Sequence, residues 1–164
     1  MATLRNLEDA FVEELKDIFH AEKQLLKAMP KMARAAHDPQ LKELLQEHLD
    51  ETQQQVKRLE AVFHSLDRTA RGRKCEGMLG LVEEGQEMMQ EKGSPDVNDA
   101  IIIASAQKIE HYEIASYGTI CKWADMLGFR EQGDLLKQNL AEEKAADEKL
   151  TELAEIINRH AQPA

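Results

Sequence analysis

The stretch AQKIEHYEIASY, residues 106–117, places carboxylates on a helix face that should be apolar. Read at helical spacing, that face is apolar or aromatic apart from two glutamates; it comprises Ile103, Ala106, Glu110, Glu113, Tyr117, Ile120, Ala124 and Leu127. A carboxylate buried without partners is costly or takes up a proton. The sequence therefore predicts that bases, hydrogen-bond donors or a metal lie opposite Glu110 and Glu113.

The composition favours one helical domain. The chain has 164 residues, of which 4 % are aromatic, and it is rich in Ala, Leu, Glu, Lys and Gln. A chain of this length can bury a core without disulfides or metal staples. We expect an all-α fold of one domain over residues 1–164, with helices at about 4–36, 39–66, 76–92, 96–127 and 130–159.

Charge and hydropathy exclude several classes of protein. The net charge of −10 argues against a nucleic-acid surface, because phosphate binding relies on clustered Lys and Arg. No apolar run approaches the roughly 20 residues that cross a bilayer. Cys75 and Cys121 stand far apart and form no metal-type pair, so we expect free thiols in a reducing compartment. The expectation is a cytoplasmic protein without nucleic-acid or membrane partners.

Prolines and capping residues mark the helix boundaries. Thr3 or Asn6 is the expected N-cap of the first helix, and Asp38 followed by Pro39 starts the second. Pro30 stands inside the first helical pattern and predicts a kink or break near Leu26, whose carbonyl the proline ring displaces.

The connections predict how the helices assemble. Within each pair of long helices the connection is tight, whereas the crossover from the second to the third long helix is longer and contains residues 76–92. This order predicts a ferritin-like antiparallel four-helix bundle with a short additional helix in that crossover.

The two halves of the chain repeat the spacing of their acids. Glu51 follows Glu22 by 29 positions, and Glu143 follows Glu113 by 30. Gln55 and Asp147 each come four residues after the second acid of a half, and His48 and Glu110 each come three residues before an acid. Antiparallel helices in a pseudo-symmetric bundle would bring the four glutamates to one level. The alternative is that each glutamate turns outward and pairs with a lysine.

Four acids at one buried level indicate a metal site. Dinuclear iron or manganese sites in helical bundles use a Glu from each of two helices and an ExxH pair from each of the others. The pairs are absent here, since Gln54 and Ala146 stand where histidine would be, but His48 offers an imidazole in reversed order. The candidate ligands are Glu22, Glu51, Glu110, Glu113, Glu143, Asp147 and His48, with Gln55 and Tyr117 as hydrogen-bonding neighbours.

The roles of three candidates stay open, because Glu110, His48 and Asp147 could bind the metal or orient a ligand. Glu110 has no counterpart in the first half, where Phe19 stands. If only one metal position is fully built, we expect it on the Glu110 side of the bundle.

Four strings carry a family resemblance: AEKQL at 21–25, HLDET at 48–52, AQKIEHYEIASYGT at 106–119 and EEKAAD at 142–147. They resemble the YciE/YciF-type bacterial stress proteins. The resemblance covers nearly the whole chain and implies a ferritin-like, rubrerythrin-related fold, a cytoplasmic homodimer and a role in stress response. It implies metal ligands at Glu22, Glu51, Glu110, Glu113, Glu143 and Asp147. The family has His or Gln at the position of Gln55, and no reaction is established for it.

Three functions follow from these observations. The first is a di-iron or mixed iron and manganese carboxylate protein that reacts with O₂ or H₂O₂. The second is a non-enzymatic stress or interaction protein with a vestigial or structural metal site, which the missing ExxH pairs and the missing rubredoxin-like Cys₄ segment favour. The third, a mini-ferritin cage, is disfavoured because the chain has no Lys-rich tail.

Overall fold

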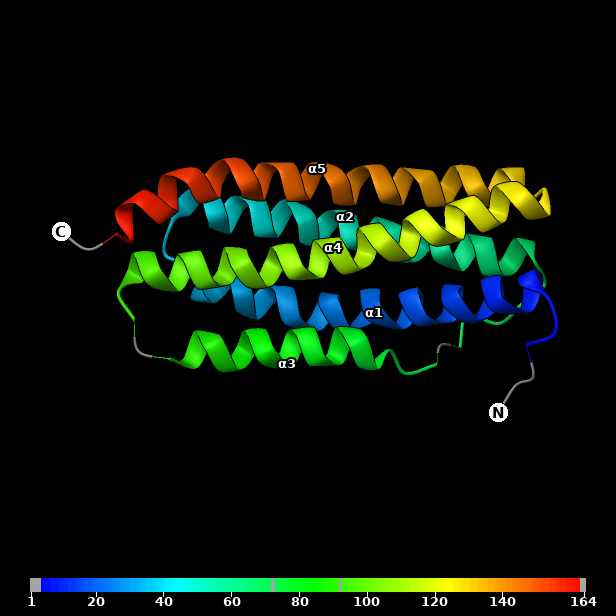
Figure 1. Ribbon diagram of the computed structural model, residues 1–164, viewed down its shortest axis with the longest axis horizontal. Helices are drawn as coiled ribbons and strands as arrows, with labels where there is room; N and C mark the ends of the chain where they lie inside the picture. Colours follow the sequence, from blue (N-terminus) through cyan, green and yellow to red (C-terminus); the bar gives the residue numbers. More distant parts are fainter. Residues whose placement is uncertain (1–3, 72, 92, 163–164) are drawn as a thin grey trace.

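The protein is helical throughout the part of the chain that the structure describes (Figure 1). The computed structural model describes residues 4–71, 73–91 and 93–162, and these ranges contain no strand. The five helices are α1 (Leu7–Ala35), α2 (Pro39–Ser65), α3 (Glu76–Gln90), α4 (Pro95–Leu127) and α5 (Arg130–His160). The prediction of an all-α fold is confirmed.

The four long helices lie side by side along the long axis of the molecule (Figure 1). α4 packs along α5, α1 packs along α2, and the two pairs meet through contacts of α2 with α5 and of α1 with α4. The shorter α3 lies outside this group and packs against α4 and α1. The bundle therefore has an interior to which four helices contribute side chains.

Side chains cap the beginnings of α1, α2 and α4, whereas α5 begins after Phe129 without a side-chain cap. The Asn6 side chain accepts a hydrogen bond from the backbone N–H of Asp9, and Asp38 caps α2 directly before Pro39. Ser94 and Pro95 start α4 in the same way. At its other end α4 stops at Gly128, whose φ of 78° is a left-handed conformation that glycine adopts readily. Thr3, the alternative cap for α1, lies outside the described residues.

Helix α1 continues through Pro30 and does not break near Leu26. A proline removes one backbone hydrogen bond from a helix and crowds the preceding turn. Met29 and Met32 flank the proline and are both buried, so packing on the neighbouring helices holds this turn in helical form. The expected break is absent because tertiary burial outweighs the local preference.

The core consists of two apolar clusters with a polar layer between them. On α2, Leu41 and Leu45 belong to one cluster, and Val56, Leu59, Val62 and Phe63 belong to the other. His48, Thr52 and Gln55 stand between the clusters and are buried. On α4 and α5 the same interval contains Glu110, Glu113, Asn139 and Glu143, also buried. The apolar clusters keep water away from both ends of this layer.

A polar network fixes the start of α3. Cys75 caps α3, its backbone N–H donates to His20 Nδ1 at 3.0 Å, and its Sγ lies 3.0 Å from Tyr112 Oη. The Tyr112 hydroxyl donates to Asp17 Oδ2 at 2.8 Å. Cys75 and Cys121 are both free thiols. The network ties α3 to α1 and α4 at one end.

Candidate metal centre

One histidine and three glutamates converge in the middle of the bundle. His48 comes from α2, Glu110 and Glu113 come from α4, and Glu143 comes from α5. All four are buried, and one donor atom from each lies within 4.8 Å of the others. His48 Nε2 is 3.0 Å from Glu110 Oε1 and 3.5 Å from Glu143 Oε2. Four donors this close together can contact a common ion.

Most atoms of this cluster that could bind a metal have no hydrogen-bond partner among the described residues. They are His48 Nε2, Glu110 Oε2, both carboxylate oxygens of Glu113, and Glu143 Oε2. His48 Nε2 lies near two carboxylates without a geometry that forms a hydrogen bond to either. Buried polar atoms nearly always have a hydrogen-bond partner. Several metal-binding atoms without such a partner in one place therefore fit a cation that all of them face. The residues present therefore fit a metal ion.

Burial and crowding raise the proton affinity of the cluster. Burial raises the pKa of Glu113 well above its usual range, and the negative charge of Glu143 raises it further. Burial also raises the pKa of Glu143, which His48 opposes. For His48 burial lowers the pKa, but Glu110, Glu51 and Glu143 outweigh it, so the pKa lies well above its usual value. Without a cation, this cluster must hold protons.

Glu22 lies beside the cluster and is held by a chain of hydrogen bonds. The Tyr117 hydroxyl donates to Glu22 Oε1. Asn139 Nδ2 donates to Tyr117 Oη at 3.0 Å, and Arg58 Nη1 donates to Asn139 Oδ1 at 2.9 Å. Burial raises the pKa of Glu22 to about 7, although the Tyr117 bond opposes the rise. Glu22 Oε2 has no partner among the described residues, so this oxygen is available to a ligand.

Gln55 holds one oxygen of Glu143. Its Nε2 donates to Glu143 Oε1, which leaves Glu143 Oε2 as the oxygen near His48. Gln55 and Tyr117 thus both hydrogen-bond to a carboxylate of the polar layer.

Three of the predicted ligands lie outside the converging group: Glu22, which lies beside it, Glu51 and Asp147. The Glu51 side chain is 36 % exposed, and its Oε2 lies 3.4 Å from His48 Nδ1, which lowers the pKa of Glu51 through that hydrogen bond. Asp147 lies on the α4 and α5 surface, where its Oδ2 is 3.2 Å from His111 Nε2 and its Oδ1 accepts from Gln107. Glu51 stands three residues after His48, about 60° round the helix, and this offset leaves His48 at the centre and Glu51 at its solvent-exposed edge.

Sequence reasoning missed two members of the hydrogen-bond chain. Asn139 stands one turn before Glu143 on the inner face of α5, and Arg58 stands one turn after Gln55 on α2. Their positions, one helical turn from Glu143 and from Gln55, were the signal in the sequence that could have identified them as neighbours of the site. Arg58 also pairs with Glu142 through two contacts of 2.7 Å each.

Comparisons with known proteins find similar proteins over nearly the whole chain. A family model described as "Domain of unknown function (DUF892)" matches residues 6–162. The protein YciF of Escherichia coli K12 is 45 % identical over 152 residues, which cover 92 % of each chain. The crystal structure of the E. coli stress protein YciF matches with a TM-score of 0.92 and 43 % identity, covering 95 % of this chain and 99 % of that one.

Two further solved structures are similar. YcfI from Rhodopseudomonas palustris is 44 % identical with a TM-score of 0.88 and covers 90 % of this chain and 94 % of its own. A protein from Xanthomonas campestris is 25 % identical with a TM-score of 0.73 and covers 93 % of each chain. Within the described residues, no helix combines the length and the apolar character that a membrane span requires.

Proposed function

Since the chain belongs to the family described as a domain of unknown function (DUF892), and is similar to the E. coli stress protein YciF, we propose that it is a ferritin-like stress-response protein with a carboxylate-bound dinuclear metal site. The metal is iron, manganese or both, and the site reacts with O₂ or H₂O₂. The order of the helices supports ferritin-like connectivity, because α3 separates the α1 and α2 pair from the α4 and α5 pair.

The observation that carries this proposal is the group of unpaired donor atoms on His48, Glu110, Glu113 and Glu143. Carboxylate oxygens combined with one imidazole suit iron and manganese better than soft, thiolate-binding metals. Both oxygens of Glu113 lack a partner among the described residues, so Glu113 would help to hold the metal.

The two proposed metal positions differ in the number of ligand residues available to each. His48 and Glu110 lie together on one side, and with Glu113 and Glu143 they supply donors for one ion. A second ion would rely on Glu22 Oε2 together with a shared glutamate. Glu51 and Asp147 would have to rotate inward to join either position. This asymmetry supports a stronger site on the Glu110 side.

The chain's own residues prepare the site for redox chemistry. Iron or manganese, when bound, supplies the electrons that reduce the oxidant. Gln55 and Tyr117 fix Glu143 and Glu22 so that one oxygen of each stays free. The apolar clusters at both ends keep bulk water out, which strengthens every charge interaction inside.

Anaerobic metal titration tests the proposal. Purified protein should bind Fe(II) or Mn(II), and the Fe(II)-loaded form should oxidise faster than Fe(II) in buffer when O₂ or H₂O₂ is added. Glu113→Gln should weaken metal binding more than about tenfold, because it removes a charged ligand. Glu47→Gln is the matched control, since Glu47 is exposed on α2 and, in the described part of the chain, forms its ion pair with Lys149. Equal binding by wild type and Glu113→Gln would contradict the proposal.

A non-enzymatic stress or interaction protein with a structural metal is the second candidate. It is favoured by the single imidazole in the cluster and by the outward positions of Glu51 and Asp147. In that case the metal should raise the melting temperature while Fe(II) oxidation stays at the buffer rate.

The proposal includes a cytoplasmic homodimer. Of the apolar residues that the sequence offers for a dimer contact, Phe19 is buried in the core and Tyr112 is tied to Asp17, whereas Met88 is 44 % exposed. Light scattering that gives the mass of a dimer would support this state, and the mass of a twelve-subunit shell would favour a cage.

A further inference from the structure

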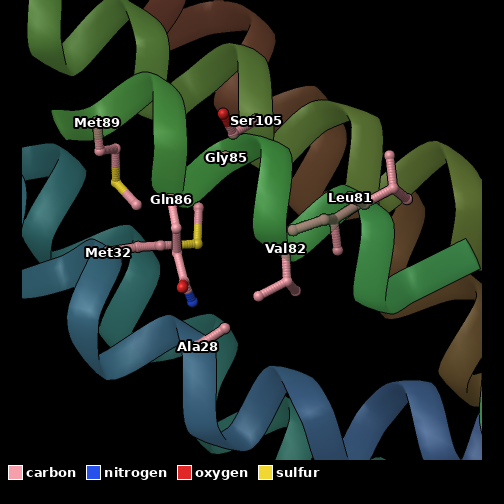
Figure 2. A pocket seen from close by; sticks show the side chains of 9 residues that line it. Ala28, Met32, Leu81, Val82, Gly85, Gln86, Met89 and Ser105 are labelled. Atoms are coloured by element: carbon pink, nitrogen blue, oxygen red, sulfur yellow. The ribbon is translucent and has the colours of Figure 1, made fainter. Parts of the chain in front are cut away.

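A small apolar cavity lies between α3 and the bundle (Figure 2). Its outer wall comes from half-buried or buried residues of α3, and its inner wall comes from buried residues of α1 and α4. The apolar lining includes Val82 and Met89 on α3, Ala28 and Met32 on α1, and Ile109 on α4, while Gln86 and Ser105 are the polar lining residues. Figure 2 shows Ala28 and Met32 of α1 facing the α3 residues Val82 and Gln86. The cavity volume is about 10 Å³.

A second cavity of about 10 Å³ lies beside the metal cluster. Met32 and Ile109 line both cavities, so these two side chains lie between the first cavity and the second. The remaining lining of the second cavity is apolar except for His48 and Glu110, which are two members of the cluster. A molecule that passes Met32 and Ile109 would therefore move from the space under α3 to the space beside the cluster.

The size and lining of these cavities select what can occupy them. A volume of about 10 Å³ leaves room for one molecule of about the size of water. The polar side chains in the lining are Gln86 and Ser105 in the first cavity and His48 and Glu110 in the second. Between these points, H₂O₂ or a hydrated ion would lose hydrogen bonds that Leu25, Met29 and Leu45 cannot replace. Dioxygen is a small apolar molecule and loses none. Met32 is unbranched and flexible, so it can move to let such a molecule pass.

We propose that the two cavities form an access route by which dioxygen crosses from the α3 face to the His48 and Glu110 edge of the cluster. The delivery of dioxygen to a metal that reacts with it rests on the proposed function. The route itself is a property of the apolar packing and exists without metal, so it can be tested separately.

Paramagnetic relaxation by dissolved O₂ tests the route in the metal-free protein. Methionine methyl groups are labelled with ¹³C, and their proton relaxation is compared under nitrogen and under O₂ pressure. The Met32 methyl should show a relaxation enhancement several-fold larger than the Met78 methyl, because Met78 is fully buried but lines neither cavity. Met126, which is 67 % exposed, gives the enhancement caused by bulk solvent.

A filling substitution and its control complete the design. Ala28→Leu should fill the outer cavity and bring the Met32 enhancement down toward that of Met78. Ala124→Leu adds the same atoms at another buried alanine, which lies on α4 and lines neither cavity, and should leave the Met32 enhancement unchanged. Melting curves show that both variants fold.

Two results would overturn the route: equal enhancements at Met32 and Met78 in the wild type, or a Met32 enhancement that survives in folded Ala28→Leu. Strong magnetisation transfer from water to the Met32 methyl would also count against it, since it shows a wet cavity. In the Fe(II)-loaded protein, Ala28→Leu should slow oxidation by O₂ several-fold and leave oxidation by H₂O₂ unchanged. If wild type oxidises no iron at all, the proposed function fails, whereas the relaxation data still decide the route.

Discussion

Tyr117 is the third of four side chains joined by hydrogen bonds. Each of the first three donates to the next one along the chain, which ends at Glu22. Arg58 donates to Asn139, Asn139 donates to Tyr117, and Tyr117 donates to Glu22. The guanidinium at the outer end is always charged. Successive hydrogen bonds polarise one another in a medium of low dielectric, so this chain favours negative charge on Glu22. It also occupies Oε1 and leaves Oε2 as the free oxygen.

Replacing Tyr117 by Phe should therefore weaken metal binding and stability together. The variant leaves Glu22 Oε1 and Asn139 Nδ2 with one partner fewer in a buried site, which costs about 1–3 kcal/mol of unfolding free energy. Loss of an orienting hydrogen bond typically lowers metal affinity about 10–100-fold. Denaturant unfolding and metal titration measure the two effects.

Tyr112→Phe is the control for that substitution. Tyr112 also donates to a carboxylate, Asp17, but it belongs to the network at the start of α3. The control should lose stability and keep its metal affinity. If Tyr117→Phe and Tyr112→Phe lose metal affinity to the same extent, Tyr117 affects the metal only through the overall stability of the fold.

The sequence pattern predicted correctly which helix faces are buried. It predicted less well which side chains on those faces come together at the site. Helical spacing pointed to Glu22, Glu110, Glu113 and Glu143 as inner positions, and all are buried. It could not separate His48 from Glu51, because residues three apart share a face to within about 60°. The neighbouring helices decide which of them points inward, and here His48 does.

At the scale of elements, α3 shows how a connecting helix is held. His20 on α1 and Tyr112 on α4 both bond to Cys75 at the start of α3. Their spacing puts them off the inner stripes of their helices, which is where a fifth helix packs. Sequence periodicity treats that face as solvent because it carries no information about a neighbour that arrives from elsewhere in the chain.

Gly77 marks a close approach of α3 to Tyr112 on α4. A Cβ placed there would lie 2.8 Å from Tyr112 Cε2, and the hydrogen bonds of Tyr112 to Asp17 and Cys75 keep its ring from moving away. Gly77→Ala should therefore destabilise the protein by about 1–3 kcal/mol, as overpacking does. Chemical denaturation measures the change.

Gly80 provides the matched control on the same helix. A Cβ there meets nothing within 4 Å. Gly80→Ala should stabilise the protein by up to about 1 kcal/mol, because alanine favours helix more than glycine. If both alanine variants are stabilised to the same extent, α3 is not held close to Tyr112.

For the whole molecule, the polar layer makes stability depend on protons or a cation. Burial raises the pKa of Glu22 from 4.5 to about 7, and burial also raises the pKa values of Glu113 and Glu143. The pKa of His48 is raised above 6.5, because its carboxylate neighbours outweigh burial. In every case the folded, metal-free protein binds protons that the unfolded chain releases at neutral pH.

The metal-free protein should therefore lose stability as the pH rises from about 5.5 to about 8. A group whose pKa is raised by folding stabilises the folded state below its unfolded value, and this contribution is lost as the pH rises through its folded value. The lowered pKa of Glu51 acts oppositely, but mainly near and below pH 4.5, outside this window. Saturating Mn(II) should flatten or reverse the trend, since the metal needs the deprotonated ligands and replaces their protons. Melting temperatures with chelator and with Mn(II) across this range measure both trends. A metal-free melting temperature that climbs steadily toward pH 8 would show that Glu22, Glu113 and Glu143 are charged and balanced by protein groups alone, with no need for a cation.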